Sequence, residues 1–318
     1  MFKGHGPHSI HPQSPSSLYS DQRTMNSRNP KKATNPEPSS HSPSLSLTLN
    51  GSLQPRYYLL TNGYPTHAKD ANQDIREMVL SSEGINKDLQ ALRYFADSVG
   101  HDPDTKPYVK VYCDKEKYNP ADESRVRTVM QIPRKLPTFI YLAGHTKTQK
   151  GGQLAYAPAD CLNPSSPGEL KLIPYETIRQ WLLSGSHSES LVFVTEVCYC
   201  ENFLRLPYAL TLEGGEARWE KTEYHGSFEA NPKGDVVHFA ATSPGEQAMT
   251  FPSTGSIFTK AFCYIDPKEK LSLKTISEQL QKNVNKLLSG SQQNPQNPKV
   301  YSSRIIVRST TVLWLDMY

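Results

Sequence analysis

The sequence has none of the features that mark a secreted or membrane-spanning protein. Its first residues, MFKGHGPHSI, lack the apolar core of a secretory signal, and no later stretch approaches the roughly 20 apolar residues of a membrane span. Its five cysteines are an odd number, so we do not expect a framework of disulfides. These absences predict a soluble protein in a reducing compartment, the cytoplasm or the nucleus.

Two further absences narrow the function. No glycine-rich phosphate loop follows any predicted strand, which argues against a nucleotide-binding domain. The formal net charge is +4, but residues 1–53 supply +3 of it, as five Lys and Arg against two Asp and Glu. This segment does not interleave basic residues with aromatic ones, as a nucleic-acid surface would. We therefore expect neither a nucleic acid nor a membrane as a partner.

Composition divides the chain into a polar tail and a folded domain. Residues 1–53 are rich in Ser, Pro, Asn, His and Gln and cannot bury enough apolar surface to offset chain entropy, so we predict disorder. The tail is either a pro-segment or partner-binding segment, or has no specific role. Residues 54–318 are the predicted domain, in two halves, 54–212 and 235–318. Between them, residues 213–234 lack hydrophobic periodicity and are predicted to form a long exposed loop.

Within the domain, short buried strands alternate with amphipathic helices. This alternation predicts an α/β fold with a mostly parallel six-stranded sheet, flanked by helices on both faces. The predicted strands are 56–62, 108–113, 138–143, 191–195, 236–241 and 304–308. The predicted helices are 84–100, 122–132, 174–183, 256–264 and 273–287.

Reactive side chains follow two of these strands. His145 comes shortly after strand 138–143, and Cys198 and Cys200 follow strand 191–195. Neighbouring strands of a parallel sheet end at the same edge, where ligands and chemistry collect. Histidine is the usual base that activates a thiol, so the pattern predicts a Cys-His dyad for acyl transfer. The alternative is that these are structural residues, since free cysteines often only fill space in a core.

The order of these segments resembles the caspase-like cysteine peptidases, and within them the metacaspases and their fungal relatives. The similarity extends from about Arg56 to the C-terminus and rests on the segments GINKDLQAL, TFIYLAGH, QLAYAPADC and VFVTEVCYCENF. In that family one strand ends in Ser-Gly-His-Gly and the next in Asp-Ser-Cys-His-Ser-Gly. This chain has Ala-Gly-His-Thr at 143–146 and Glu-Val-Cys-Tyr-Cys-Glu at 196–201.

The resemblance implies a catalytic role for residues at matching positions. Cys198 would be the nucleophile and His145 the general base. The backbone N–H groups of Thr146 and Cys198 would form an oxyanion hole for the tetrahedral intermediate. Cys200 falls where the family has serine and is the weaker candidate. The reaction implied is that of a cysteine-type endopeptidase on protein or peptide substrates, and it requires no cofactor.

The resemblance also implies a specificity pocket. Asp88 and Glu196 match acidic residues of a pocket that accepts Arg or Lys before the scissile bond, and two carboxylates suit a guanidinium. Many relatives cut themselves in the segment that corresponds to 213–234, where Arg218, Lys221 and Lys233 are candidate cleavage points. The alternative is that this segment is a tolerated surface insertion.

Departures from the family pattern favour a second function. Thr146, Tyr199 and Glu201 replace smaller or differently charged family residues next to the two catalytic positions. The alternative prediction is therefore a catalytically inactive caspase-fold protein that acts as a binding or regulatory module. Calcium-dependent relatives carry acidic residues shortly after the nucleophile, whereas this chain has Arg205 there, so no metal site is predicted.

Overall fold

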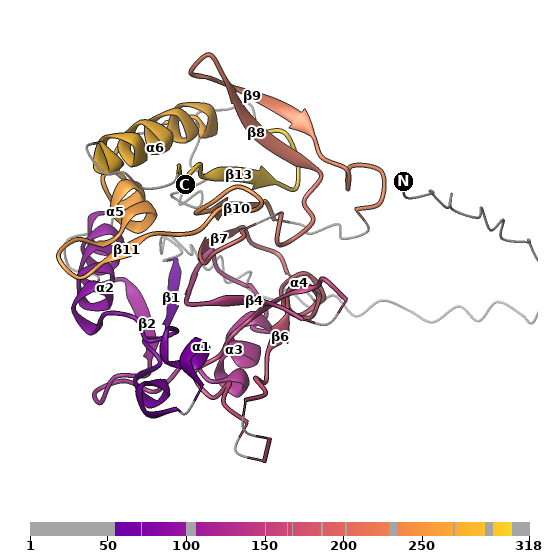
Figure 1. Ribbon diagram of the computed structural model, residues 1–318. Coiled ribbons are helices and arrows are strands. Elements are labelled where there is room, and N and C mark those ends of the chain that lie inside the picture. The colour runs from indigo at the N-terminus through magenta and orange to yellow at the C-terminus, as the bar shows by residue number, and fades with distance from the viewer. Residues whose placement is uncertain are drawn as a thin grey trace, which may run out of the picture. The chain divides into compact units, whose positions relative to one another are not determined.

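An eight-stranded sheet with parallel and antiparallel parts forms the centre of the folded unit, residues 50–318 (Figure 1). The structure, a computed structural model, describes residues 55–70, 72–99, 106–149, 151–163, 165–166, 168–185, 187–200, 202–228, 234–269, 271–289 and 295–306. The predicted tail, residues 1–53, lies outside the described residues.

Five neighbouring strands of the sheet pair in parallel, and the remaining three pair antiparallel. The strand order is β2-β1-β3-β7-β10-β13-β8-β9, and the order β2 to β10 is the parallel part. The strands are β1 (Arg56–Thr61), β2 (Tyr108–Cys113), β3 (Thr138–Ala143), β7 (Leu191–Glu196), β10 (Val236–Ala240), β13 (Lys299–Ser302), β8 (Tyr208–Glu213) and β9 (Glu216–Lys221). The predicted α/β fold with a mostly parallel sheet is confirmed, but the sheet has eight strands rather than the predicted six.

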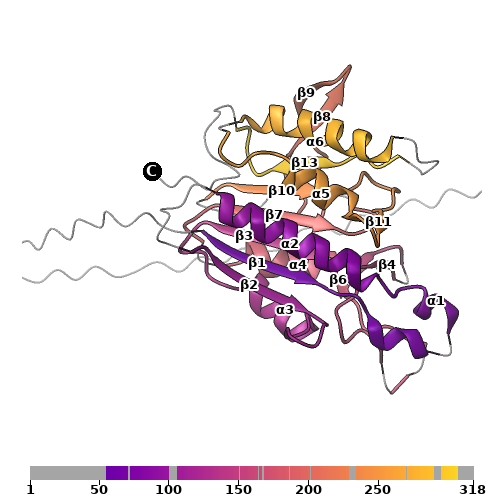
Figure 2. The ribbon, with the colours of Figure 1, turned by 90° about the vertical axis from the view of Figure 1, so that its left-hand side faces the viewer.

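Helices cover both faces of this sheet (Figures 1 and 2). Helices α2, α5 and α6 lie on one face, and α3 and α4 lie on the other. Their bounds are α2 (Ser82–Ser98), α5 (Ile257–Cys263), α6 (Leu273–Leu288), α3 (Glu123–Met130) and α4 (Tyr175–Leu183). The remaining short elements are η1 (Pro65–Lys69), α1 (Gln73–Arg76), β4 (Thr146–Thr148), β5 (Leu154–Tyr156), β6 (Ile173–Pro174), β11 (Thr250–Phe251) and β12 (Gly255–Ser256).

The local sequence explains why the central strands and the long helices form. Every residue of β3 and β7 is buried, as expected of strands covered by helices on both faces. Helix α2 begins after Ser81, whose side chain accepts a hydrogen bond from the Gly84 N–H, a cap that stabilises a helix by about 1 kcal/mol. Leu89 and Leu92 point from α2 into the core, and burying each contributes roughly 2 kcal/mol.

The segment predicted to be a long exposed loop contains a strand. Residues 216–221 form β9, which pairs antiparallel with β8. The prediction was wrong for this part because the strand is at an edge: Ala217 is buried and Trp219 packs against the core, while their neighbours are charged and exposed. Residues 223–227 are turn, and Lys233 lies outside the described residues.

The last predicted strand was also misplaced. Residues 304–306 are not in a strand, and 307–308 lie outside the described residues. The strand that fills this place is β13, Lys299–Ser302, which pairs antiparallel with β10 and β8. Its short run of buried side chains follows a proline-rich stretch and gave a weaker apolar pattern than RIIVR.

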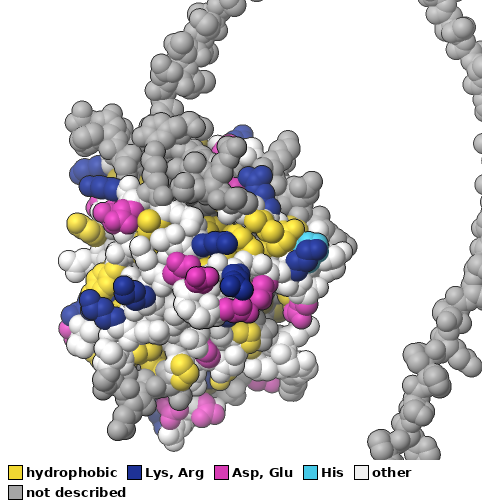
Figure 3. All heavy atoms as spheres, turned by 90° about the horizontal axis from the view of Figure 1, so that it is seen from above, with side chains coloured by type: hydrophobic (Ala, Val, Ile, Leu, Met, Phe, Trp, Pro, Cys, Tyr) yellow, Lys and Arg dark blue, Asp and Glu magenta, His cyan; other side chains and the backbone are white. Residues whose placement is uncertain are grey.

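The surface over α6 and the β8–β9 hairpin carries both signs of charge. Figure 3 shows basic and acidic side chains interspersed there, with scattered hydrophobic ones. In the described part of the chain, no helix combines the length and apolar character that a membrane crossing needs. All five cysteines are free thiols.

Candidate active site

Strands β3 and β7 bring His145 and Cys198 to one edge of the sheet. The strands are parallel neighbours, and Ala143 pairs with Glu196 at their last register position. The Gly144 N–H then donates to the Glu196 carbonyl at 3.3 Å. His145 and Cys198 each lie two residues beyond the last pair, so the predicted meeting of two strand ends is realised in the fold.

The imidazole of His145 is held by a backbone carbonyl. Its Nε2 lies 2.8 Å from the carbonyl oxygen of Met78, which can only accept, so Nε2 carries the proton and Nδ1 has the lone pair. Burial lowers the pKa of His145 to about 4, against the opposing effect of this hydrogen bond. His145 is therefore neutral near pH 7 and able to accept a proton.

The two thiols differ in accessibility. Cys198 is partly exposed, whereas Cys200 is fully buried and its thiol donates to the Val197 carbonyl at 3.0 Å. Burial raises the pKa of both thiols, that of Cys200 to about 11. For Cys198 the effect of burial is partly offset, because a hydrogen bond with the backbone of Ala248 and the positive charge of Lys147 both lower the pKa of the thiol.

The first N–H group of the expected oxyanion hole is that of Thr146 in β4. On either side of it the β4–β5 ladder is hydrogen-bonded: the Ala157 N–H donates to the His145 carbonyl, and the Gln149 N–H donates to the Gln153 carbonyl. Hydrogen-bonded and non-hydrogen-bonded pairs alternate in an antiparallel ladder, so Thr146, opposite Tyr156, is at a non-hydrogen-bonded position and its N–H points away from β5.

The second N–H of the expected oxyanion hole is that of Cys198. Among the described residues it has no hydrogen-bond acceptor, whereas the next N–H, of Tyr199, donates to the Glu246 carbonyl at 2.8 Å. Thr146 has no positive φ, so a threonine is compatible with the backbone here; Tyr199 has φ 55°, an unfavourable angle for a side chain of its size.

Asp88 and Glu196, the predicted pocket residues, both form hydrogen bonds with the start of α5. Asp88 on α2 accepts hydrogen bonds from the N–H and hydroxyl of Ser256, at 2.8 and 2.6 Å. One oxygen of Glu196 accepts from the N–H and hydroxyl of Thr259, at 2.8 and 2.7 Å. The other, Oε1, is buried and has no partner among the described residues.

The two carboxyl groups share a buried environment that disfavours their charge. Burial raises the pKa of Asp88 to about 6. Burial, together with the negative charge of Asp88, raises the pKa of Glu196 to about 8. The hydroxyl of Tyr141 lies 2.8 Å from that of Thr259 and extends the network. Near pH 7 Asp88 is therefore mostly charged and Glu196 mostly neutral, so the site holds less negative charge than the two carboxylates that the sequence suggested.

Several contacts at this site could not be predicted from the sequence. The carbonyl of Met78 has no sequence signal, because every residue has one. Ser256 and Thr259 lie far along the chain from Asp88 and Glu196, and only the packing of α5 against α2 and β7 brings them there. Glu201, predicted to add negative charge beside the nucleophile, lies outside the described residues.

Comparison with known proteins is consistent with this geometry. The family model described as the caspase domain matches residues 66–308, about three quarters of the chain. No curated protein matches the chain.

Proposed function

Because this chain belongs to the caspase domain family, we propose that it is a cysteine endopeptidase with Cys198 as nucleophile and His145 as general base. The observation that supports this assignment is the register of β3 and β7, since both residues stand two positions beyond the pair Ala143 and Glu196. The proposed substrates are proteins or peptides.

The protonation states suit a reaction that begins from a neutral pair. Nδ1 of His145 takes the proton from the Cys198 thiol as sulfur attacks the scissile carbonyl carbon. The imidazolium that forms keeps its Nε2–H on the Met78 carbonyl and then gives the new proton to the leaving amine. Water, deprotonated by His145, hydrolyses the thioester and releases the free thiol.

The N–H groups of Thr146 and Cys198 are proposed to stabilise the oxyanion. Neither is used by a strand ladder, so both remain able to donate to the oxygen that becomes negative in the tetrahedral intermediate. The Thr146 hydroxyl is hydrogen-bonded to that of Tyr175 on α4, which fixes the threonine side chain away from this role.

Asp88 and Glu196 are proposed to select Arg or Lys before the scissile bond. Both are buried acidic groups, and Oε1 of Glu196, which has no partner among the described residues, could accept from a guanidinium or ammonium when the carboxyl is ionised. Arg offers paired donors for such an acceptor set, so we expect Arg to be preferred over Lys.

The test is hydrolysis of peptide reporters that end in Arg, Lys or Asp. We expect cleavage of the Arg and Lys reporters, none of the Asp reporter, loss of cleavage in Cys198→Ala, and retention in Cys200→Ala after correction for stability. Cleavage that survives Cys198→Ala would overturn the nucleophile assignment. No turnover of any reporter would favour a binding or regulatory module instead.

A further inference from the structure

The hydroxyl of Tyr64 interrupts the strand ladder at His145. His145 and Ala157 face each other just before β4 begins and just after β5 ends, and the Ala157 N–H donates to the His145 carbonyl at 2.9 Å. A regular antiparallel pair would return a bond from the His145 N–H to the Ala157 carbonyl. Here the His145 N–H donates to the Tyr64 hydroxyl at 3.0 Å, and that hydroxyl donates to the Ala157 carbonyl at 2.7 Å.

The adjacent glycine leaves room for this hydroxyl. Gly144 has φ 146°, and a Cβ there would overlap the hydroxyl oxygen of Tyr64. Only glycine combines that angle with that space. The Tyr64 hydroxyl therefore occupies space that is open only because residue 144 has no side chain.

Tyr64 is itself held firmly. It has the left-handed φ of 55° that side chains rarely adopt, and it is fully buried. The Asp114 carboxylate accepts from the N–H groups of Gly63 and Tyr64, both at 2.7 Å, and so stabilises this turn.

The same small cluster also contacts the ring of His145. The rings of Tyr64 and His145 are 5.3 Å apart between centroids, tilted by 35°. Tyr64 packs in one buried cluster with Met78, Ala157 and Cys161, and Met78 is the residue whose carbonyl accepts from His145 Nε2. The backbone and the imidazole of His145 thus depend on the same cluster.

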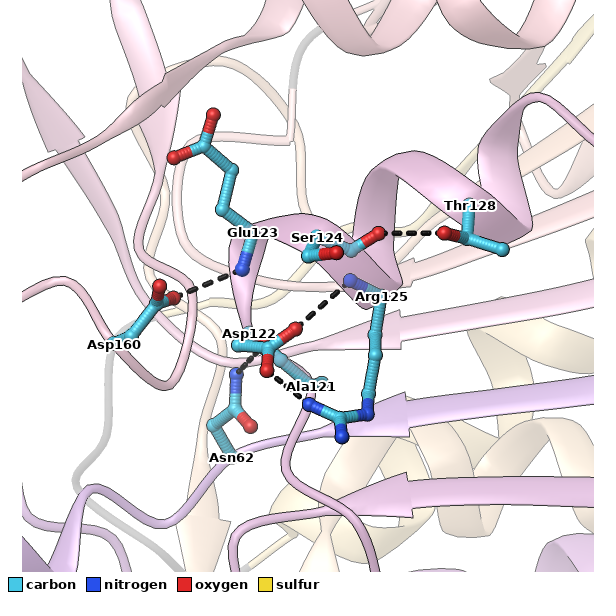
Figure 4. A network of polar contacts seen from close by, with 8 residues as sticks. All are labelled: Asn62, Ala121, Asp122, Glu123, Ser124, Arg125, Thr128 and Asp160. Atoms are coloured by element: carbon cyan, nitrogen blue, oxygen red, sulfur yellow. Dashed lines mark hydrogen bonds and ion pairs between the residues drawn. The ribbon is translucent and has the colours of Figure 1, made fainter.

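A second tyrosine fixes the residue two positions before His145. The hydroxyl of Tyr156 donates to the Ala143 carbonyl at 3.1 Å and accepts from the Asn62 side chain at 3.1 Å. Asn62 also donates to the Ala121 carbonyl, which anchors the turn after β1 to the start of α3 (Figure 4).

We propose that the Tyr64 hydroxyl is a positioning group for His145: by replacing a ladder bond, it sets where the imidazole stands relative to Cys198. This inference rests on the proposed function, and it assigns Tyr64 no contact with the substrate. If the hydroxyl is removed, the His145 N–H and the Ala157 carbonyl lose their partner and can close the ladder directly. That movement would draw His145 away from the Met78 carbonyl.

The test compares Tyr64→Phe with Tyr57→Phe. Tyr57 is a matched control, because it is equally buried on β1 and its hydroxyl has no partner among the described residues. We expect Tyr64→Phe to lower kcat by about 10- to 100-fold with KM unchanged, since a small displacement of a catalytic group has effects of this size. Tyr57→Phe should behave as wild type.

A second readout does not need hydrolysis. The ¹⁵N chemical shifts of the His145 imidazole report which nitrogen carries the proton. Wild type and Tyr57→Phe should show the Nε2–H form, and Tyr64→Phe a mixture of both forms. If wild type cleaves no reporter, the proposed function fails, and the ¹⁵N shifts of Tyr64→Phe still decide the inference.

The inference is overturned if Tyr64→Phe keeps the wild-type kcat and the Nε2–H form, or loses kcat while that form is unchanged. If Tyr64→Phe does not fold, Asp114→Asn replaces it, because it weakens the turn that holds Tyr64 and keeps the hydroxyl. We expect a smaller change in the same direction, and none in the exposed control Asp97→Asn. An Asp114→Asn variant that matches wild type in both readouts would then overturn the inference.

Discussion

Glu196 and Asp88 differ in how their carboxyl oxygens are occupied. Both oxygens of Asp88 accept from Ser256, whereas Glu196 has one oxygen on Thr259 and one without a partner in the described structure. The pKa of Glu196 is raised to about 8, so its carboxyl is mostly protonated at pH 7. A cation gains the full attraction of this site only once Glu196 has lost its proton.

The ionisation of Glu196 predicts that kcat/KM depends on pH. For an Arg reporter, kcat/KM should rise as pH increases through about 8, because kcat/KM reports ionisation in the free enzyme. Glu196→Gln should lower kcat/KM at pH 8.5 by at least about 10-fold and flatten the rise. The variant loses a charge–charge interaction with the substrate cation, and an interaction as large as a one-unit pKa shift is worth about 1.4 kcal/mol. Steady-state kinetics from pH 6 to 9 measure this.

Glu216→Gln is the matched control for that experiment. Glu216 lies on β9 with a side chain that is 78% exposed, and its loss should leave the pH profile unchanged. A profile that keeps its wild-type rise in Glu196→Gln would show that another group controls the ionisation, and the assignment of Glu196 to the pocket would be wrong.

Single residues also mark the limit of what the sequence could predict about the site. His145 and Cys198 were predicted because each follows a buried apolar run, and a parallel sheet aligns the ends of such runs. The Met78 carbonyl and the Tyr64 hydroxyl were not, because their roles depend on how the segment 62–79 folds back over the strand ends. Their partners come from that tertiary path, which no local pattern encodes.

At the level of elements, the β8–β9 hairpin changes where the chain can be cut. Arg218 and Lys221 lie in β9 and pair with Thr211 and Tyr208 of β8. A peptidase site binds an extended chain whose backbone groups are free, so paired residues are poor cleavage points. Any self-processing within 213–234 is therefore predicted after Lys233.

Mass spectrometry of the purified protein after incubation tests this. Fragments that end at Lys233 are expected in wild type, and none in Cys198→Ala or Lys233→Gln. Fragments that end at Arg218 or Lys221 at early times would contradict the protection that we ascribe to the hairpin.

The side chain of Arg205 links the segment after the nucleophile to α4. Arg205 forms an ion pair with Glu176 at 3.1 Å, and Glu176 also pairs with Arg179. The described residues contain no cluster of three or more His, Cys, Asp or Glu side chains suited to a metal ion. A divalent cation at Glu176 would have to compete with two guanidinium groups.

We therefore predict that calcium does not change the rate. Hydrolysis of an Arg reporter should be the same in millimolar calcium and in excess chelator, and Glu176→Gln should not create a calcium response. A strong activation by calcium in wild type would mean that acidic groups other than Glu176 bind it.

For the whole molecule, the sequence predicted the parallel half of the sheet better than the antiparallel half. Strands β1, β3, β7 and β10 are continuous apolar runs, because helices cover both their faces. Strands β8 and β9 are only partly buried and β13 has only four residues, so their apolar patterns are weak, and β9 was predicted to be part of a loop. The same difference explains why RIIVR was preferred to the true strand Lys299–Ser302.

Buried neutral histidines make the fold sensitive to acid. Burial lowers the pKa of His145 to about 4 and that of His238 to about 3, from 6.5. The unfolded chain takes up these protons below pH 6.5 and the folded one does not, so the contribution of these two histidines to stability is full above pH 6.5 and is lost as pH falls toward 4. The raised pKa values of Asp88 and Glu196 act in the opposite direction over the same range, so the histidine contribution is measured as a difference in Tm between wild type and a histidine variant.

His238→Asn isolates one part of this effect. His238 is fully buried, and its Nε2 lies 2.9 Å from the Thr195 hydroxyl, so the variant should be less stable at pH 7 but lose less Tm between pH 7 and pH 4. An unchanged pH dependence in this variant would show that His238 does not contribute to the acid sensitivity.

The most direct test of the central claim is to find the atom that attacks. A peptidyl electrophile that ends in Arg should form a covalent adduct with the wild-type protein, and peptide mass spectrometry should locate the adduct at Cys198. His145→Ala should slow its formation by about 100-fold or more, within the range expected for loss of a general base. An adduct at Cys200, or equal labelling with and without His145, would contradict the account.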